Sequence, residues 1–161
     1  MSTVYNVLFL CTGNSARSIM AEALLNQKAK GRMVAYSAGS HPSGRVRPEA
    51  LKQLESSGIS TQGLRSKSWD EFADGPPMHF VFTVRDNAAN EACPFWPGHP
   101  LTAHWGVADP AAVEGTPERI ERAFRDAFFI LERRISLFLA LPLPNLEERT
   151  IQDEIESIGK Q

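Results

Sequence analysis

Short apolar runs alternate with amphipathic segments along most of the chain. Residues 5–10, 33–39 and 79–84 are rich in β-branched and aromatic residues and are bounded by turn residues, which predicts three strands. A long loop is expected at 85–100 and a fourth short strand at 101–106. Since residues 5–10 are nearly all apolar, as in a strand covered on both faces, we place them in the middle of a parallel sheet.

Helical spacing of apolar residues predicts three helices. Residues 15–31 and 47–58 each carry an apolar face and end in glycine, and the longest helix begins with Thr116 as its N-cap and runs toward Pro142. One or two further helical turns are expected at 68–73. Strands that alternate with helices imply a doubly wound α/β sheet, in which ligands bind at the carboxyl ends of the strands.

The 161 residues are enough for one domain with a sizeable core. We expect residues 1–145 to form this domain, while the polar tail 146–161 carries a short peripheral helix or is frayed. Hydrophobic residues make up 42% of the chain and no apolar run approaches the roughly 20 residues of a membrane span, which favours a soluble protein. The N-terminus lacks the positive region and cleavage site of a signal peptide, so a cytoplasmic location is expected.

Charge and cysteine content narrow the function classes. A net charge of −2 speaks against a general nucleic-acid or membrane-surface binder, so any anion specificity must be local. The two cysteines, Cys11 and Cys93, provide no disulfide framework. In a reducing compartment, lone thiols of this kind are more often buried or catalytic than structural bridges.

The segment LFLCTGNSARSIMAEALL, residues 8–25, places a thiol and a guanidinium on the loop where the first strand becomes a helix. Such a loop points successive backbone N–H groups at one spot, and the helix dipole adds positive potential there. Gly13 and Asn14 are residue types that tolerate the unusual dihedrals of this arrangement. We therefore expect Cys11 to be held as a thiolate and to act as a nucleophile at neutral pH.

Arg17 completes a Cys-x5-Arg-Ser pattern. Its planar guanidinium matches two oxygens of a tetrahedral oxyanion, and the hydroxyl of Ser15 or Ser18 can hydrogen-bond the sulfur. A buried cysteine beside a solvated arginine is the structural alternative, which the flanking strand and helix disfavour. The residues expected to bind the oxyanion are Thr12, Gly13, Asn14, Ser15, Ala16 and Ser18.

The stretch VLFLCTGNSARSIMAEALL resembles the low-molecular-weight protein tyrosine phosphatase family, and its Cys-Thr-Gly-Asn-Ser form is most similar to the arsenate reductase branch. The resemblance spans about residues 5–140 and includes SAGS at 37–40, FVFTVRDNAANEACPFWPG at 80–98 and HWGVADPA at 104–111. It implies a three-layer α/β fold with a four-stranded parallel sheet flanked by helices, in agreement with the elements predicted above.

Displacement by a thiolate also needs a proton for the leaving oxygen, which a carboxyl group near the loop usually supplies. Asp109-Pro110 matches the general acid of the family, whereas a lone Asp-Pro otherwise indicates a turn. His104 and Trp105 come shortly before it and are expected to pack and to fix the loop rather than to catalyse.

Phosphate and arsenate are nearly isosteric, so other positions must separate a reductase from a phosphatase. Tyrosine phosphatases of this family commonly follow the Asp-Pro with aromatic residues that wall the aryl ring, and this chain has Ala111 and Ala112 there. We favour an arsenate reductase. The alternatives are a phosphomonoester phosphatase that acts through a phosphocysteine, and an anion-binding or regulatory module without turnover.

An arsenate reductase passes two electrons to arsenic: a second thiol attacks the sulfur of the Cys–As adduct, arsenite leaves and a disulfide remains. Relatives that do this within the chain carry two further cysteines; here Cys93 is kept, Arg85 stands where the other would be, and Ala16 replaces a common loop cysteine. Two routes remain open: Cys93 resolves Cys11, or an external thiol does so, from glutathione with glutaredoxin or from thioredoxin. Arg85 is expected to be a solvated surface residue; the alternative is a charge that steers an anion or glutathione.

No bound cofactor is implied, since the thiol reductant is a co-substrate. Some relatives hold a monovalent cation beside the loop; Asn14, Ser37, Ser68 and Asp70 are only loose matches, so no metal site is assigned. The implied partners are arsenate or phosphate and, transiently, glutaredoxin or thioredoxin, with no nucleic acid and no membrane.

Overall fold

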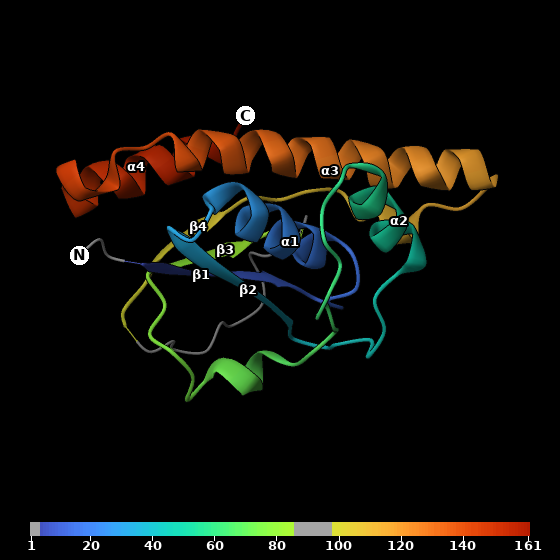
Figure 1. Cartoon of the computed structure of the whole chain (residues 1–161), viewed down its shortest axis with the longest axis horizontal. Helices are drawn as coiled ribbons and strands as arrows, with labels where there is room; N and C mark the ends of the chain where they lie inside the picture. The colour runs from blue at the N-terminus through green and yellow to red at the C-terminus, as the bar shows by residue number, and fades with distance from the viewer. Residues whose placement is uncertain (1–3, 86–97) are drawn as a thin grey trace.

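In the computed structural model, which describes residues 4–85 and 98–161, strands form one parallel sheet (Figure 1). The strands are β1 (Tyr5–Cys11), β2 (Met33–Gly39), β3 (Phe80–Thr83) and β4 (Leu101–His104), in the order β2-β1-β3-β4. β1 pairs with β2 over its whole length and with β3 on its other edge. The predicted parallel sheet with residues 5–10 at its centre is confirmed, although β4 ends at His104 instead of residue 106.

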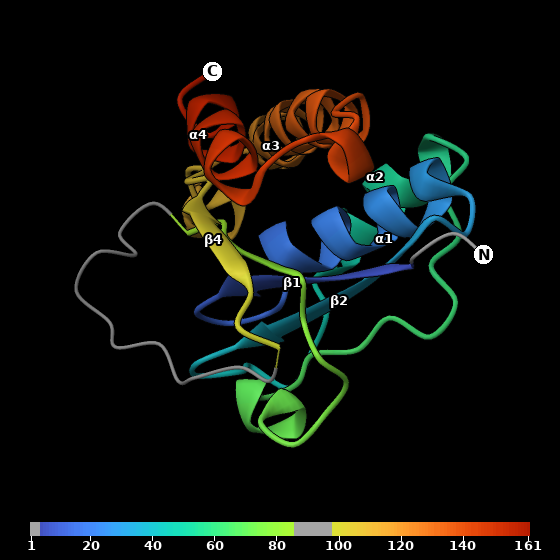
Figure 2. The same ribbon diagram turned by 90° about the vertical axis from the view of Figure 1, so that its left-hand side faces the viewer.

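Helices cover both faces of the sheet. The α-helices of the described residues are α1 (Arg17–Ala29), α2 (Pro48–Ser56), α3 (Pro117–Leu139) and α4 (Glu148–Ile158), and the 3-10 helices are η1 (Trp69–Phe72), η3 (Pro110–Ala112) and η4 (Leu143–Asn145). The α-helices lie on one face, whereas η1 covers the other (Figures 1 and 2). The predicted helices are present, with α1 beginning at Arg17 rather than at residue 15.

Two apolar clusters hold these layers together. The larger one fills the space between the sheet and the α-helices, where Trp105 stacks on Phe82 with ring centroids 3.8 Å apart and both meet Phe138 edge to face. The smaller one contains Leu8 and Leu10 and lies toward η1. Because alternate residues of β1 enter opposite clusters, this strand needs apolar residues at nearly every position.

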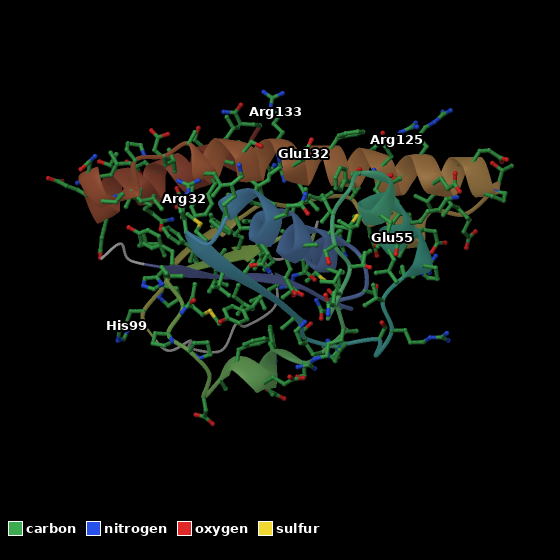
Figure 3. The ribbon with its side chains drawn as sticks, in the orientation of Figure 1. Arg32, Glu55, His99, Arg125, Glu132 and Arg133 are labelled. Carbon is green, nitrogen blue, oxygen red and sulfur yellow. The ribbon has the colours of Figure 1, made fainter. Side chains whose placement is uncertain are left out.

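The long helix α3 is amphipathic. The hydroxyl of Thr116 accepts a hydrogen bond from the Arg119 N–H at 3.2 Å, which is the N-cap predicted from the sequence. The buried apolar residues, at three- and four-residue spacing, are Phe124, Ala127, Phe128, Leu131, Ile135 and Phe138. Arg125 and Arg133 point away from the sheet (Figure 3). Nowhere in residues 4–85 and 98–161 is a helix both long and apolar enough to span a membrane.

The polar tail forms a packed helix. α4 places Ile151, Ile155 and Ile158 in the larger apolar cluster, and the indole N–H of Trp105 donates to the Ile155 carbonyl at 2.9 Å. Of the two alternatives for residues 146–161, a frayed end and a helix, the structure has the helix. Its isoleucines join the core on which the sheet rests.

The sheet brings the carboxyl ends of its strands together beside the start of α1. Cys11 ends β1 level with Gly39 of β2, and Leu10 lies level with Thr83 at the end of β3. The next strand, β4, ends at His104, opposite Thr83. This edge of the sheet therefore holds both the loop after Cys11 and the segment after His104, which is where ligands bind in α/β sheets.

Candidate active site

Cys11 is the last residue of β1 and is only 4% exposed. The chain then turns through residues 12–16 into α1, and Asn14 adopts a left-handed conformation with φ 47°. The predicted unusual dihedral is thus found at Asn14, a residue type that tolerates it, and not at Gly13. The turn brings the Asn14 N–H back onto the sulfur, to which it donates at 3.1 Å.

Residues 40–47 hold the carbonyl groups of this loop. Four backbone hydrogen bonds run from N–H groups of this segment to loop carbonyls: Ser40 to Cys11, His41 to Thr12, Ser43 to Gly13 and Arg47 to Ser15. They are 2.9–3.2 Å long. Because the carbonyl oxygens face residues 40–47 and accept hydrogen bonds there, they do not repel an anion on the other side of the loop.

The start of α1 is left for an external acceptor. Its N-cap residue is Ala16, and no side chain of the described residues caps the first turn. The first N–H groups of a helix have no partner within the helix, and the dipole makes this end positive. An oxyanion is therefore a suitable acceptor at this point of the loop.

Gly39 allows β2 to approach the loop. A Cβ at this position would collide with the Thr12 carbonyl oxygen and lie 3.0 Å from the Asn14 nitrogen. Any other residue would push the loop away from the sheet. In the sequence this glycine is visible only within SAGS, and its steric role becomes apparent from the pairing of Gly39 with Cys11.

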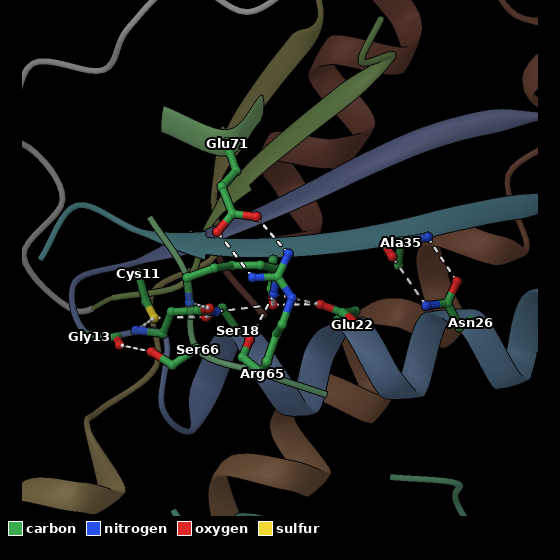
Figure 4. Close-up of polar contacts among 12 residues, drawn as sticks. Cys11, Gly13, Ser18, Glu22, Asn26, Ala35, Arg65, Ser66 and Glu71 are labelled. Carbon is green, nitrogen blue, oxygen red and sulfur yellow. Dashed lines mark hydrogen bonds and ion pairs between the residues drawn. The ribbon is translucent and has the colours of Figure 1, made fainter. Parts of the chain in front are cut away.

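The side chain of Asn14 sets the direction of a hydrogen-bond chain that ends on the sulfur. Its Oδ1 accepts from the backbone N–H of Lys67 at 2.9 Å, and since a backbone N–H can only donate, the NH2 group must face the other way. That NH2 group donates to Ser18 Oγ at 2.8 Å. Ser18 Oγ lies 2.8 Å from Cys11 Sγ (Figure 4). The hydroxyl hydrogen of Ser18 is thus available to the sulfur, which suits a thiolate acceptor.

Arg17 links this loop to a second segment of the chain. Its side chain is 7% exposed, Nη1 donates to the Val107 carbonyl at 3.0 Å, and Nη2 lies 3.6 Å from Asp109 Oδ2. The alternative of a solvated arginine beside a buried cysteine is therefore wrong, because this guanidinium is buried and oriented. Its orientation depends on a carbonyl that lies 90 residues further along the chain.

Asp109 is more accessible than Arg17, with a side chain that is 36% exposed. Its Oδ1 accepts the Ala111 N–H at 3.0 Å and caps η3, so the Asp-Pro does form the turn that is typical of this dipeptide. Its Oδ2 is the oxygen that faces Arg17. The fold thus brings Asp109 to the same edge of the sheet as Cys11.

The residues before Asp109 continue the sheet beyond β4. The Trp105 N–H donates to the Thr83 carbonyl at 2.6 Å, and the Val107 N–H donates to the Val84 carbonyl at 2.9 Å. Trp105 is completely buried, and Nδ1 of His104 lies 2.8 Å from the Thr83 hydroxyl. Trp105 therefore packs in the core, and the exposed His104 helps to fix this segment through Thr83.

Arg85 is buried, so the expectation of a solvated surface arginine is wrong. It directly follows Val84, whose N–H donates to Leu10 and whose carbonyl accepts from Val107, so the backbone is still enclosed by its neighbours at this point. Cys93, the candidate resolving thiol, lies outside the described residues, as does most of the predicted loop at 85–100.

Lys67 is a buried charge that the sequence did not reveal. Its ammonium lies 3.5 Å from Glu22 Oε1, 3.3 Å from Ser37 Oγ and 2.9 Å from the Arg65 carbonyl. Burial is the largest cause that shifts the pKa of Lys67, which it lowers, and the attraction of Glu22 opposes that shift. A lysine within a polar segment is ordinarily solvated, so only the long-range contacts disclose this position.

The residues considered for a monovalent cation divide into two groups. Asn14 and Ser37 lie together, 3.0 Å apart, with the Lys67 ammonium beside Ser37. Ser68 and Asp70 belong to the start of η1, where the Ser68 hydroxyl accepts the Asp70 N–H at 3.1 Å. Across the two described ranges, no group of three or more His, Cys, Asp and Glu side chains is placed to hold a metal ion.

Comparison with known proteins places this loop in a family. A sequence model described as low molecular weight phosphotyrosine protein phosphatase matches residues 6–151. An arsenate reductase from Halalkalibacterium halodurans is 36% identical over 132 residues, which cover 82% of this chain and 93% of that protein. An arsenate reductase from Bacillus licheniformis is 37% identical over 115 residues, with coverage of 70% and 78%.

Solved structures agree with the fold. An arsenate reductase in the phosphate binding state superposes with a TM-score of 0.67 at 26% identity, covering 84% of this chain and 97% of the other. The Corynebacterium glutamicum thioredoxin-dependent arsenate reductase gives a TM-score of 0.59 at 27% identity, covering 84% of this chain. This chain spans only 64% of that longer protein.

Proposed function

Because the chain belongs to the low molecular weight phosphotyrosine protein phosphatase family, and within it to the arsenate reductase branch, we propose that it reduces arsenate to arsenite with Cys11 as the nucleophile. The observation that carries the proposal is the environment of the sulfur. Cys11 Sγ receives the Asn14 N–H at 3.1 Å and lies 2.8 Å from the Ser18 hydroxyl. Two donors aimed at one sulfur stabilise its anionic form.

The oxyanion is proposed to bind above Cys11. Residues 12–16 and the start of α1 supply backbone N–H donors, and the guanidinium of Arg17 supplies two parallel donors for two oxygens of the anion. The Val107 carbonyl and the Asp109 carboxylate contact that guanidinium and orient it. A point charge at position 17 would attract the anion without matching its shape.

The first chemical step forms a sulfur–arsenic bond. The Cys11 thiolate attacks arsenic(V), one arsenic–oxygen bond breaks, and the departing oxygen leaves as water after it takes a proton from the Asp109 carboxyl group. Arsenic stays pentavalent in this step, so no electron has yet been transferred. Asp109 fits the acid role because its side chain is partly exposed at the same edge of the sheet.

The second step is the reduction. A second thiolate attacks Cys11 Sγ, a sulfur–sulfur bond forms and the sulfur–arsenic bond breaks, with its electron pair passing to arsenic. Arsenic(V) becomes arsenic(III) and leaves as arsenite, while the two sulfurs become a disulfide. Reduction of that disulfide by an external dithiol or by glutathione regenerates the Cys11 thiol.

The identity of the second thiol decides the reductant. If Cys93 attacks Cys11, the product is a disulfide within the chain, which suits thioredoxin; a similar protein from Corynebacterium is described as thioredoxin-dependent. The sequence has Arg85 at the position of the other relay cysteine, so a complete internal relay is lacking. We therefore infer that glutathione with glutaredoxin is the preferred reductant, and that thioredoxin is the alternative.

A phosphomonoester phosphatase is the second candidate function. The description of the family favours it. In that reaction Cys11 would form a phosphocysteine that water hydrolyses. Against an aryl phosphate substrate stand Ala111 and Ala112, which follow Asp109 in η3 and offer no ring to pack on an aryl group.

A coupled assay separates the two functions. The purified protein receives arsenate with glutathione, glutaredoxin and glutathione reductase, or with thioredoxin and thioredoxin reductase, and NADPH oxidation is followed; an aryl phosphate is offered in parallel. We expect arsenate-dependent NADPH loss, faster with the glutathione system. Aryl phosphate turnover at enzyme-like efficiency, without arsenate-dependent NADPH loss under either reductant, would make the protein a phosphatase. Cys93→Ser should lower the rate steeply only if Cys93 resolves Cys11.

Alkylation distinguishes an enzyme from an anion-binding module without turnover. The rate at which iodoacetamide modifies Cys11 is measured against pH by mass spectrometry of the peptide that carries it. For a catalytic thiolate the midpoint lies well below about 8.5, the value of a free thiol. A midpoint at or above that value would favour the binding module.

A further inference from the structure

A buried ion pair lies beneath the oxyanion loop. The side chains of Lys67 and Glu22 are 8% and 15% exposed, whereas those of the surface pair Lys52 and Glu121 are 70% and 52% exposed. Removing two charges from water is unfavourable unless their attraction and further hydrogen bonds offset the desolvation. A buried pair that a chain of hydrogen bonds connects to the reactive sulfur therefore indicates a role beyond stability.

We propose that Lys67 is a positioning residue for the nucleophile: it orients Asn14 and holds a positive charge beneath the loop. The proposal rests on the proposed function, in which Cys11 is the nucleophile. Lys67 does not contact the sulfur, so it acts through the side chains between them.

The backbone of Lys67 fixes the polarity of the hydrogen-bond chain. Its N–H donates to Asn14 Oδ1 at 2.9 Å, and its carbonyl accepts from the Gly39 N–H at 2.9 Å, which ties this segment to the end of β2. With the oxygen of the amide so engaged, both hydrogens of the Asn14 NH2 group point inward, to Ser18 at 2.8 Å and to Ser37 at 3.0 Å. A reversed amide would place two donors face to face.

The ammonium of Lys67 supports the other end of the chain. Its three N–H groups match three acceptors: Ser37 Oγ, the Arg65 carbonyl and the Glu22 carboxylate. Ser37 accepts from both Asn14 and Lys67 and donates to Glu22 at 2.6 Å, so its donor and acceptor sites are occupied. Glu22 and Ser18 are one helical turn apart on α1 (Figure 4). The network therefore connects the ion pair to the sulfur, and every hydrogen-bond donor and acceptor of the Ser37 hydroxyl takes part in it.

The charged groups around this network determine whether a substitution favours or disfavours the Cys11 thiolate. Lys67 faces Glu22 from α1, Arg65 from its own segment and Glu71 from η1. Glu71 is engaged with the Arg65 guanidinium at 2.6 and 3.0 Å, which leaves Glu22 as the main counter-charge of Lys67. Arg17 and Asp109 form a separate ion pair, 3.6 Å apart, which variants at positions 67 and 22 leave in place.

Removing the positive charge and removing the negative charge of this ion pair should therefore shift the pH midpoint of Cys11 alkylation in opposite directions. Lys67→Met leaves the Glu22 carboxylate without its cation, and the net negative charge disfavours the Cys11 thiolate. Glu22→Gln keeps the hydrogen bond from Ser37 but leaves Lys67 unopposed, which favours the thiolate. We expect midpoints of Cys11 alkylation to rise by about 0.5–1 pH unit in the first variant and to fall by about as much in the second, less than a charge in direct contact produces.

The measurement is iodoacetamide alkylation of Cys11 against pH in the full chain, with near-ultraviolet circular dichroism to show that each variant is folded. Lys52→Met is the matched control, because it removes an equally charged lysine from an exposed ion pair and should leave the midpoint unchanged. The double variant Glu22→Gln/Lys67→Met removes both charges and should return close to the original midpoint. If Lys67→Met alone does not fold, the fall of the midpoint in Glu22→Gln and its reversal in the double variant carry the test.

Shifts of opposite sign, with recovery in the double variant, support the proposal. Shifts in the same direction would mean that the variants merely disturb the loop, and unchanged midpoints would mean that the ion pair does not act on the sulfur; either result overturns it. Failure of the proposed function looks different: if Cys11 is not an activated nucleophile, the original protein itself alkylates at the midpoint of a free thiol, and if the protein is a phosphatase, the coupled assay shows no arsenate-dependent NADPH loss.

Discussion

The loop after Cys11 and the segment that carries Asp109 meet at one site, but they are held in different ways. The Cys11 loop joins β1 directly to α1, and four backbone hydrogen bonds from residues 40–47 fix it. The Asp109 segment reaches Arg17 through the Val107 carbonyl, 90 residues further along the chain. The first arrangement is local in sequence, whereas the second depends on the order of the strands in the sheet.

This difference indicates what each part contributes. In the proposed function the loop binds the anion with backbone donors, which survive replacement of a side chain, and it encloses a sulfur that is 4% exposed. The Asp109 segment contributes one carboxyl group, 36% exposed, on a turn that the Ala111 N–H stabilises. Variants of the loop should therefore separate binding from turnover, and variants at Asp109 should change mainly the rate.

The largest effect is expected from Cys11→Ser. Turnover of arsenate should fall to the level without enzyme, because a serine hydroxyl at this position is not ionised at neutral pH. Binding of phosphate or arsenate, measured by calorimetry, should persist, since the backbone donors and Arg17 remain. Loss of binding along with turnover would mean that the sulfur, and not the loop, holds the anion.

Arg17→Lys should lower kcat/KM by about 10²-fold or more, because the charge remains but two parallel donors are lost. The contacts to Val107 and Asp109 require the same guanidinium, so the loss includes its orientation. Steady-state kinetics with arsenate test this. Arg133→Lys is the matched control, since Arg133 lies on the outer side of α3 (Figure 3) and should give unchanged kinetics.

Asp109→Asn should lower kcat by about 10²-fold with a small change in KM, because the amide cannot supply the proton. An asparagine oxygen at this position can still accept the Ala111 N–H, so the turn of η3 should be preserved. Asp153→Asn, on the exposed side of α4, is the control. A full rate in Asp109→Asn would remove Asp109 from the mechanism.

Substitution of two glycines near the loop should change the stability of the protein by different amounts. Gly39→Ala should lower the free energy of unfolding by roughly 2–4 kcal/mol, because the added Cβ meets the Thr12 carbonyl oxygen. At Gly13 the nearest atom to an added Cβ is Ser15 Oγ at 3.6 Å, which is an ordinary contact. Gly13→Ala should therefore change the free energy of unfolding by about 1 kcal/mol or less. Urea unfolding of both variants measures the difference, and equal losses would contradict the steric argument.

Local sequence patterns predicted much of the fold. The alternation of apolar strands and amphipathic helices predicted the parallel sheet, and the N-cap at Thr116 predicted the start of α3. The motif from Cys11 to Arg17 predicted the loop and its place, because strand, turn and helix follow one another directly there. The sequence left Ser15 and Ser18 open as partners of the sulfur, and the structure places Ser18, in the first turn of α1, at this contact.

Other features depend on residues that are far apart in the sequence. The acceptor of the Arg17 guanidinium is the Val107 carbonyl, and the partners of Lys67 come from α1 and β2. Arg85 was expected at the surface because an arginine in a polar loop usually lies there, but it is buried directly after Val84, whose backbone pairs on both sides. Such positions become visible only once the sheet order is known.

The central claim, that Cys11 performs the reduction of arsenate, is tested most directly by measuring arsenite itself. The protein in molar excess over arsenate is mixed with glutathione and glutaredoxin, and arsenite is quantified by chromatography against a blank without protein. We expect the original protein to convert the added arsenate to arsenite and Cys11→Ser to match the blank. Arsenite from Cys11→Ser above the blank, or none from the original protein with either glutaredoxin or thioredoxin, would contradict the account.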